Sequence, residues 1–178
     1  EIDAHRARAT QPGTSGDPPV RSANPDTYFQ SREATNPWYN AVYDHVEQAM
    51  NDFAAATGRQ YQPFEYYGHP QAERVIILMG SAIGTSEEVV DELLTRGEKV
   101  GVLKVRLYRP FSAKHLLQAL PGSVRNVAVL DRTKEPGAQA EPLYLDVMTA
   151  LAEAFNNGER ETLPRVIGGR YGLSSKEF

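Results

Sequence analysis

From about residue 64 onward, the chain alternates short apolar runs with segments that have the apolar spacing of a helix. The runs at 75–79, 100–107 and 127–130 have the length and composition of strands covered on both faces. The segments between them place apolar residues three and four positions apart, which indicates helices with one buried face. This alternation predicts an α/β domain with a mostly parallel sheet, right-handed crossovers and helices on both faces.

Other elements are predicted from start and stop signals. Asn36 is a good N-cap and Pro37 suits the first position of a helix. Gly58 can end that helix, which we expect at 37–57. We also expect a strand at 64–67, a helix opened by a capping box of Thr85 and Glu88, a short helix after Ser112, a helix from Pro142 and a last strand at 165–167.

Residues 10–36 have a different composition, rich in Pro, Gly, Ser, Thr and Asn. The prolines of this segment interrupt regular hydrogen bonding, so we expect an extended connector. Tyr28, Phe29 and Trp38 are unusual in a disordered tail, and we expect them to pack on the domain or to contact another molecule. The predicted organisation is an N-terminal arm at 1–36 and one α/β domain at 37–178, made of the helix 37–57, a sheet region at 62–170 and a C-terminal connector at 171–178.

The composition excludes several classes of function. A net charge of −4 argues against a basic nucleic-acid-binding protein and against a polybasic membrane anchor. No apolar run reaches about 18 residues and the first ten residues are polar, so we expect neither a transmembrane helix nor a signal peptide. The absence of cysteine excludes disulfides and iron–sulfur or zinc sites held by thiolates of this chain. We expect a cytoplasmic globular protein.

The strand-to-helix turn at 80–85 is a candidate anion site. Gly80, Ser81 and Thr85 would lie where free backbone N–H groups at a helix N-terminus can face a phosphate. The turn lacks the G-x-G-x-x-G spacing and the lysine of a P-loop. A plain tight turn before a capped helix is therefore the preferred interpretation, with the phosphate cradle as the alternative.

The loop at 131–137 is a second candidate, because it follows a buried strand and so lies at the sheet edge where open α/β folds bind ligands. It carries four charged side chains in five residues, Arg132 and Lys134 among them, which are too many to bury unpaired. We favour a structural or interdomain ion-pair network. Binding of an anionic cofactor tail is the alternative.

Three further arginines are expected near the same edge of the sheet. Arg106 and Arg109 flank the end of the strand at 100–107, and Arg170 follows the last strand. Arginine suits bidentate contacts to carboxylate or phosphate. Solvated or internally paired arginines explain the pattern at least as well.

Few residues suggest catalysis. The four histidines are far apart and follow no metal-ligand spacing. No G-x-S-x-G motif is present, and no Ser–His–Asp arrangement is apparent. This near-empty catalytic inventory indicates that the chain does not run a reaction alone.

Several segments of the chain, in order, resemble one region of the pyruvate:ferredoxin (flavodoxin) oxidoreductases. The matching segments are NPDTYFQSREATNPWY at 24–39, GHPQAERVIILMGSAIGT at 68–85, GEKVGVLKVRLYRPFS at 97–112, LDRTKEPGAQAEPLYLDV at 130–147 and VIGGRYGLSSKEF at 166–178. They span almost the whole chain, and the last two are the most specific. The resemblance is to the second core domain of these enzymes, preceded by the connector from the first.

The resemblance implies a three-layer α/β/α fold similar to the C-terminal domain of transketolase. Its five-stranded mixed sheet is mostly parallel, and the strand at 64–67 would be antiparallel to the rest. The parent enzyme would use thiamine diphosphate, Mg²⁺ and [4Fe-4S] clusters, with coenzyme A as substrate and ferredoxin or flavodoxin as electron acceptor. Those cofactors would be held by other domains of the parent polypeptide, which we expect to be a homodimer, and none by this chain, which resembles an excised fragment.

Two hypotheses follow for the chain. The leading one is a non-catalytic core domain that scaffolds neighbouring cofactor-binding domains through its sheet edge and its arm. The alternative is a module that binds the phosphates of coenzyme A through the 80–85 turn, Arg109 and Lys134. A free-standing hydrolase or transferase has little support, because no nucleophile–base pair is apparent.

Overall fold

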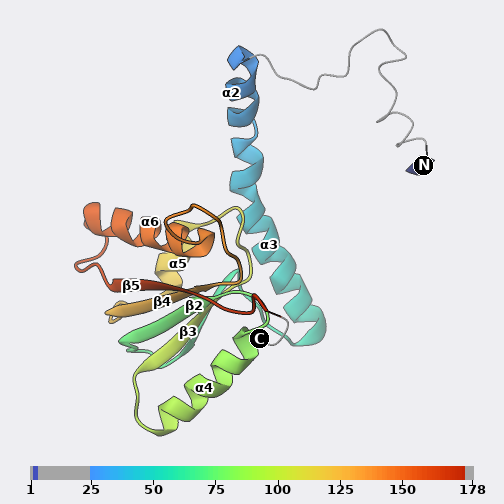
Figure 1. Ribbon diagram of the computed structural model, residues 1–178. Helices are drawn as coiled ribbons and strands as arrows, with labels where there is room; N and C mark the ends of the chain where they lie inside the picture. The colour runs from blue at the N-terminus through green and yellow to red at the C-terminus, as the bar shows by residue number, and fades with distance from the viewer. Residues whose placement is uncertain (1, 4–24, 175–178) are drawn as a thin grey trace. The chain divides into compact units, whose positions relative to one another are not determined.

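The computed structural model describes residues 2–3 and 25–174. Five strands and five helices follow one another along residues 25–174 (Figure 1). They are α2 (Pro25–Glu33), α3 (Asn36–Thr57), β1 (Phe64–Gly68), β2 (Arg74–Leu78), α4 (Ile83–Thr95), β3 (Val100–Val105), α5 (Ala113–Ala119), β4 (Asn126–Asp131), α6 (Pro142–Asn156) and β5 (Arg165–Arg170). No helix in this part of the chain is both long and apolar enough to cross a membrane.

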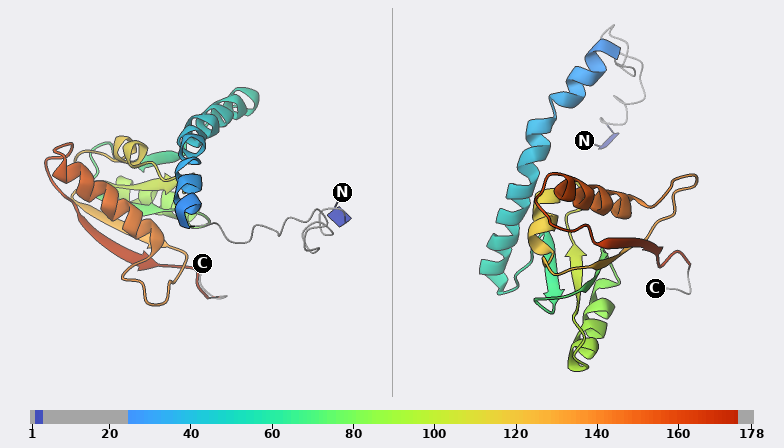
Figure 2. Two further views of the ribbon diagram at one scale, coloured as in Figure 1. Left: turned by 90° about the horizontal axis from the view of Figure 1, so that it is seen from above. Right: turned by 90° about the vertical axis from the view of Figure 1, so that its left-hand side faces the viewer.

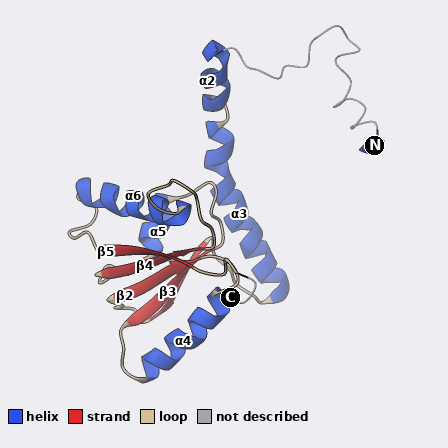
Figure 3. Cartoon of the chain, in the orientation of Figure 1, coloured by secondary structure: helices blue, strands red, loops and turns tan. Residues whose placement is uncertain are grey.

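The strands form one mixed sheet in the order β1-β3-β2-β4-β5 (Figure 3). β1 is antiparallel to β3, with Phe64 opposite Val105, whereas β2, β3, β4 and β5 are parallel to one another. The predicted α/β fold with a five-stranded, mostly parallel sheet is confirmed, as is the antiparallel first strand. Each predicted strand is present.

Helices cover the two faces of the sheet unequally (Figures 1 and 2). α5 and α6 lie on one face, where Leu116, Val147 and Leu151 pack with Ile77 and Val129 of the sheet in the main core. α4 lies on the other face, where its Val90 joins a smaller cluster with Leu78 and Val102. Burial of these side chains on both faces explains why β2 and β3 are continuous apolar runs.

β5 runs three residues beyond the predicted 165–167, because two glycines let it continue beside β4. Gly168 pairs with Val129 and Gly169 with Leu130. A Cβ at Gly168 would lie 3.0 Å from the Tyr144 ring, and one at Gly169 would lie 2.7 Å from a Leu130 methyl group. Glycine is required here by close packing, so it does not end the strand.

Three predicted helix caps differ from the structure. Asn36, the predicted N-cap, is itself the first residue of α3, and its side-chain amide donates to Glu33 at 2.8 Å. α4 begins at Ile83 with Ala82 as its N-cap, so Thr85 lies inside the first turn and the capping box of Thr85 and Glu88 is wrong. Ser86 instead donates its hydroxyl to the Ala82 carbonyl at 2.8 Å, inside the helix. Ser112 does occupy the N-cap position of α5, but its hydroxyl makes no capping bond to the backbone.

The N-terminal arm is only partly within the described residues. Residues 10–24, part of the expected extended connector, lie outside them. Residues 25–33 form α2, so the extended prediction is wrong there, because Pro25 occupies the first helical position and no other proline lies within the helix. Tyr28, Phe29 and Trp38 are 51%, 67% and 77% exposed. Whether they pack on the domain or contact another molecule stays a prediction.

Candidate functional site

The carboxyl ends of the parallel strands bring the predicted site residues to one edge of the sheet. Because β2, β3, β4 and β5 are parallel, the loops that leave them start at the same edge. Ser81 follows β2, Arg109 follows β3, Arg132 and Lys134 follow β4, and Arg170 ends β5. The structure divides these residues among three separate polar clusters.

The first cluster lies at the topological switch point of the sheet. The neighbouring strands β2 and β4 lead to helices on opposite faces, α4 and α6 (Figure 1). Folds of this kind bind their ligands in the crevice that opens between two such strands. Gly80 and Ser81 follow β2 and Arg132 follows β4, so these residues lie on the two sides of the switch point.

Hydrogen bonds within the chain link the two sides of the switch point. Arg132 donates from Nη1 to the Ser81 hydroxyl oxygen at 3.0 Å and from Nε to the Gly172 carbonyl at 3.2 Å. Tyr171 donates its hydroxyl to the Met79 carbonyl. Gly80 has a φ of +86°, and a Cβ there would lie 3.5 Å from the Tyr171 hydroxyl. The Ser81 hydroxyl is thus held by Arg132, while Thr85 is exposed in the first turn of α4.

The second cluster is centred on Glu141, whose residue is only 4% exposed. Its carboxylate accepts hydrogen bonds from Arg170 Nε at 2.5 Å and from the Glu135 backbone N–H at 2.9 Å. Lys134 Nζ lies 3.8 Å from the same carboxylate and donates to the Glu135 carbonyl at 2.8 Å. Burial alone would raise the pKa of Glu141, but these hydrogen bonds and the two positive charges hold its pKa below the usual value. The predicted network of the 131–137 loop is present within the chain.

Asp131 organises the start of the same loop. It is 1% exposed, and its two carboxylate oxygens accept the backbone N–H groups of Leu143 at 2.9 Å and Tyr144 at 3.1 Å. These groups belong to the first turn of α6, whose N–H donors have no partner within the helix. Burial raises the pKa of Asp131, although both hydrogen bonds favour the ionised form. The carboxylate therefore acts as a distant cap for α6.

Arg109 belongs to a third cluster. Its Nη1 donates to Asp146 on α6 at 2.6 Å and its Nη2 to the Tyr108 hydroxyl at 2.9 Å. Its guanidinium also lies 3.9 Å from the centre of the Tyr108 ring. Burial, together with the neighbouring Asp146, raises the pKa of Tyr108 to about 12. Arg109 is thus one of the paired edge arginines that the sequence left as an alternative.

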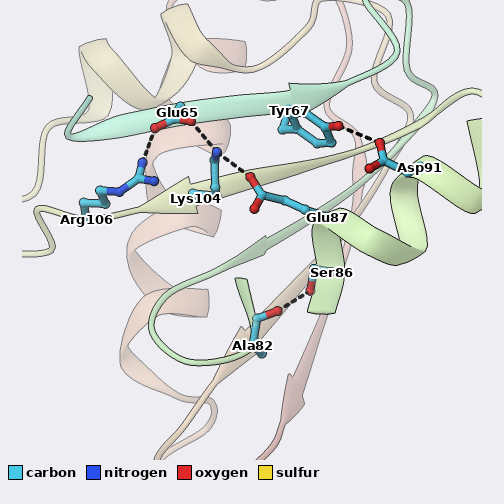
Figure 4. A network of polar contacts seen from close by, with 8 residues as sticks. All are labelled: Glu65, Tyr67, Ala82, Ser86, Glu87, Asp91, Lys104 and Arg106. Atoms are coloured by element: carbon cyan, nitrogen blue, oxygen red, sulfur yellow. Dashed lines mark hydrogen bonds and ion pairs between the residues drawn. The ribbon is translucent and has the colours of Figure 1, made fainter. Parts of the chain in front are cut away.

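A further charged network, centred on Lys104 of β3, was not anticipated. Lys104 is 3% exposed and lies between Glu65 of β1 and Glu87 of α4, with 2.7 Å to Glu87 (Figure 4). Arg106, predicted near the sheet edge, also pairs with Glu65. Two opposite charges offset the desolvation of the buried ammonium group, so this network fastens α4 to the sheet. Its sequence signal was one lysine within an otherwise apolar run.

The structure also contains a serine–histidine contact. The Ser112 hydroxyl oxygen lies 2.6 Å from His115 Nδ1, and the His115 ring stacks on Tyr43 with 3.6 Å between ring centres. The two residues lie three positions apart at the start of α5. Their contact joins α5 to Tyr43 of α3, a structural role that accounts for it without catalysis.

The described residues do not fit a metal ion or an iron–sulfur cluster. Over residues 2–3 and 25–174, no group of three His, Asp or Glu side chains is arranged to hold a metal ion. Thiolate ligands for a cluster are ruled out by the sequence itself. We therefore derive no chemical step through a metal or cluster bound by this chain.

Comparison with known proteins adds to this geometry. The model of the pyruvate:ferredoxin oxidoreductase core domain II family matches residues 72–172. The chain belongs to this family. The matched segment contains most of the sheet and all three edge clusters.

Curated relatives agree and are much longer. The chain is 92% identical over 180 residues to the probable pyruvate-flavodoxin oxidoreductase of Escherichia coli K12 and 59% identical over 180 residues to that of Trichormus variabilis. It spans only 15% and 14% of those two proteins, while they cover 100% and 99% of it. A chain of the solved 2-oxoglutarate:ferredoxin oxidoreductase of Magnetococcus marinus covers 90% of this chain over 23% of its own, at 19% identity and a TM-score of 0.48, too weak a similarity to carry an argument.

Proposed function

We propose that this chain is a non-catalytic core domain of a thiamine-diphosphate-dependent pyruvate:ferredoxin or flavodoxin oxidoreductase. The parent enzyme would convert pyruvate and coenzyme A to acetyl-CoA and CO₂, with electrons passed to ferredoxin or flavodoxin. Its thiamine diphosphate, Mg²⁺ and [4Fe-4S] clusters would be held by other domains. We place the parent in the cytoplasm and expect it to be a homodimer.

The single observation that supports a scaffolding role most strongly is the set of hydrogen bonds across the switch point. Folds of this kind that bind ligands hold them at this point. Here Arg132 joins Ser81 to Gly172, and Tyr171 donates to the Met79 carbonyl. These hydrogen bonds hold the edge loops in one arrangement.

The paired charges support the same role. Lys134 and Arg170 share Glu141, and Arg109 pairs with Asp146. Such pairs lower the positive charge available to a coenzyme A phosphate. They also fix the loops at the sheet edge, which would present a rigid surface to the neighbouring domains. Precise support matters because catalytic groups must be held within roughly half an ångström of productive geometry.

The proposal can be tested in a full-length chimera, in which this chain replaces the matching 180 residues of the Escherichia coli relative. Arg132→Gln combined with Lys134→Gln removes two of the edge contacts. We expect weaker assembly and a kcat for pyruvate oxidation lowered by about 10- to 100-fold, because small displacements of catalytic groups have effects of this size.

Arg96→Gln is the matched control, since Arg96 is an exposed arginine that pairs only with Glu92 on its own helix. The measurements are gel filtration and steady-state kinetics with varied coenzyme A. Unchanged assembly and turnover in the double variant would contradict the bracing role. A raised KM for coenzyme A at unchanged kcat would favour the coenzyme A-binding alternative instead.

A further inference from the structure

Part of one sheet face carries no helix within the described residues. α4 packs against β3 and β1 and meets β2 at Leu78, whereas the rest of the α4-side face of β2, and those of β4 and β5, lie beyond it (Figure 2). Ile76, Ala128 and Ile167 stand in register across these three strands. All three are partly or largely exposed, and Ile167 is 53% exposed.

This bare surface and the side of α4 form an apolar groove of about 720 Å³. Val89 of α4, 52% exposed, forms one wall, and Ile167 of β5 forms the other. Exposed apolar surface that is gathered into one groove is rare on proteins that act alone and is typical of a docking surface. On the opposite face α6 packs against β4 and β5, so within residues 25–174 these two strands lack a helix only on the α4 side.

The two ends of the groove differ chemically. At the amino edge of the strands it is lined by Arg74, Asn126 and Arg165. Arg74 is engaged with Glu98, while Arg165 is exposed. At the carboxyl edge the lining is formed by Thr85, Ser86 and Tyr171, which are uncharged. The groove therefore has an apolar middle and one positively charged end.

We propose that this groove binds an amphipathic α-helix from another part of the same parent polypeptide. An α-helix with its side chains is about 10 Å wide, the thickness of a layer that covers a sheet. The chain spans only 15% of the Escherichia coli relative, so most of such a polypeptide lies outside it. This inference rests on the proposed function only in taking the chain as part of a longer protein.

The charge at one end gives the helix a direction. α4 runs from the carboxyl edge of the parallel strands to their amino edge, antiparallel to the strands, as helices in α/β folds do. A second helix with the same direction would place its C-terminus near Arg165. The negative end of its dipole, or an acidic side chain in its last turn, complements that guanidinium group.

Thiol labelling tests the docking, because the chain contains no cysteine of its own. Val89→Cys and Ile167→Cys place thiols on the two walls, and Leu145→Cys, at a 42% exposed position on α6, is the control outside the groove. The rate at which each thiol is alkylated is measured by mass spectrometry in the isolated chain and in the full-length chimera. Each rate is divided by the rate of the same thiol in the urea-unfolded protein, so that intrinsic differences between sites cancel.

We expect both groove thiols to react freely in the isolated chain and at least about tenfold more slowly in the chimera, as buried thiols do. The control thiol reports whether the chain is folded alike in both proteins. Equal rates for the groove thiols in the two proteins would overturn the proposal. Protection in the isolated chain that grows with its concentration would also overturn it, because a second copy would then be the occupant.

A photo-crosslinking residue at position 167 of the chimera identifies the occupant. We expect a crosslink to a helical peptide from the same polypeptide. A crosslink to the other subunit, or protection without any crosslinked peptide, as a small apolar ligand would give, contradicts the proposal. These readouts do not need turnover, so an inactive chimera would count against the proposed function while leaving the docking result intact.

Discussion

Asp131 offers the sharpest test of how the carboxyl edge is held together. Its carboxylate accepts the backbone N–H groups of Leu143 and Tyr144 from a position that is 1% exposed. Asp131→Ala leaves these two donors without an acceptor in a region that water does not reach easily. Asp131→Asn keeps one carbonyl oxygen but turns an amide N–H₂ group toward the second donor.

The magnitude follows from the contacts. A hydrogen bond to a charged group contributes about 1.5–3 kcal/mol, so the two together contribute about 3–6 kcal/mol before desolvation is counted. Burial raises the pKa of Asp131, which means that desolvation of the carboxylate offsets part of this gain. We therefore expect Asp131→Ala to lower the free energy of unfolding by about 2–4 kcal/mol and Asp131→Asn by about 1–2 kcal/mol.

The measurement is urea unfolding followed by far-UV circular dichroism, since the only tryptophan, Trp38, is 77% exposed and reports poorly on the sheet. Asp146→Ala is the matched control. Asp146 pairs with the exposed Arg109, and its loss should cost at most about 1 kcal/mol. If the free energies of unfolding of Asp131→Ala and Asp146→Ala differed by less than about 0.5 kcal/mol, the capping role argued from these hydrogen bonds would be refuted.

Other predictions concern glycines and a histidine. A Cβ at Gly68, where φ is +135°, would lie 2.5 Å from the Gly101 Cα, so Gly68→Ala should lower the unfolding free energy by about 2 kcal/mol or more. Gly84→Ala, inside α4 and facing open space, should raise it by about 0.5–1 kcal/mol in the same urea assay. Burial and the charge of Lys114 lower the pKa of His115 below 6.5. The unfolded chain then binds the proton more readily, so stability should fall as the pH drops below about 6.5, and His115→Phe should show a shallower decline in the urea midpoint.

The strands were predictable because their physical signal is local. The run from Val75 to Leu78 is apolar because Val75 and Ile77 enter the main core on one face and Leu78 enters the smaller cluster on the other, and a pattern of that kind can be read without knowing the partners. α2 was missed because the proline-rich composition before it obscured Pro25 as a first helical residue. The start of α4 was misplaced because Thr85 resembles a cap, whereas the close packing of Ala82 against Leu78 and Val102 sets where the helix begins.

The candidate site was predictable in position but not in its contacts. Parallel strand order places Ser81, Arg132 and Arg170 at one edge, and that much follows from the alternation of elements. The partners of these residues are far away in the sequence, with Arg132 and Ser81 separated by 51 positions. Such pairs depend on the paths of the loops and on the C-terminal segment, which no local pattern encodes. The buried Lys104 was missed for the same reason, since its partners Glu65 and Glu87 lie on separate elements.

Calorimetric titration of the chain with coenzyme A tests most directly whether the charged side chains at the carboxyl edge stabilise the fold or bind a ligand. Because Arg132, Lys134 and Arg109 are each held by partners within the chain, we predict no saturable heat up to millimolar coenzyme A. A saturable signal that disappears in the Arg132→Gln and Lys134→Gln double variant would contradict this account and identify the carboxyl edge as a binding site.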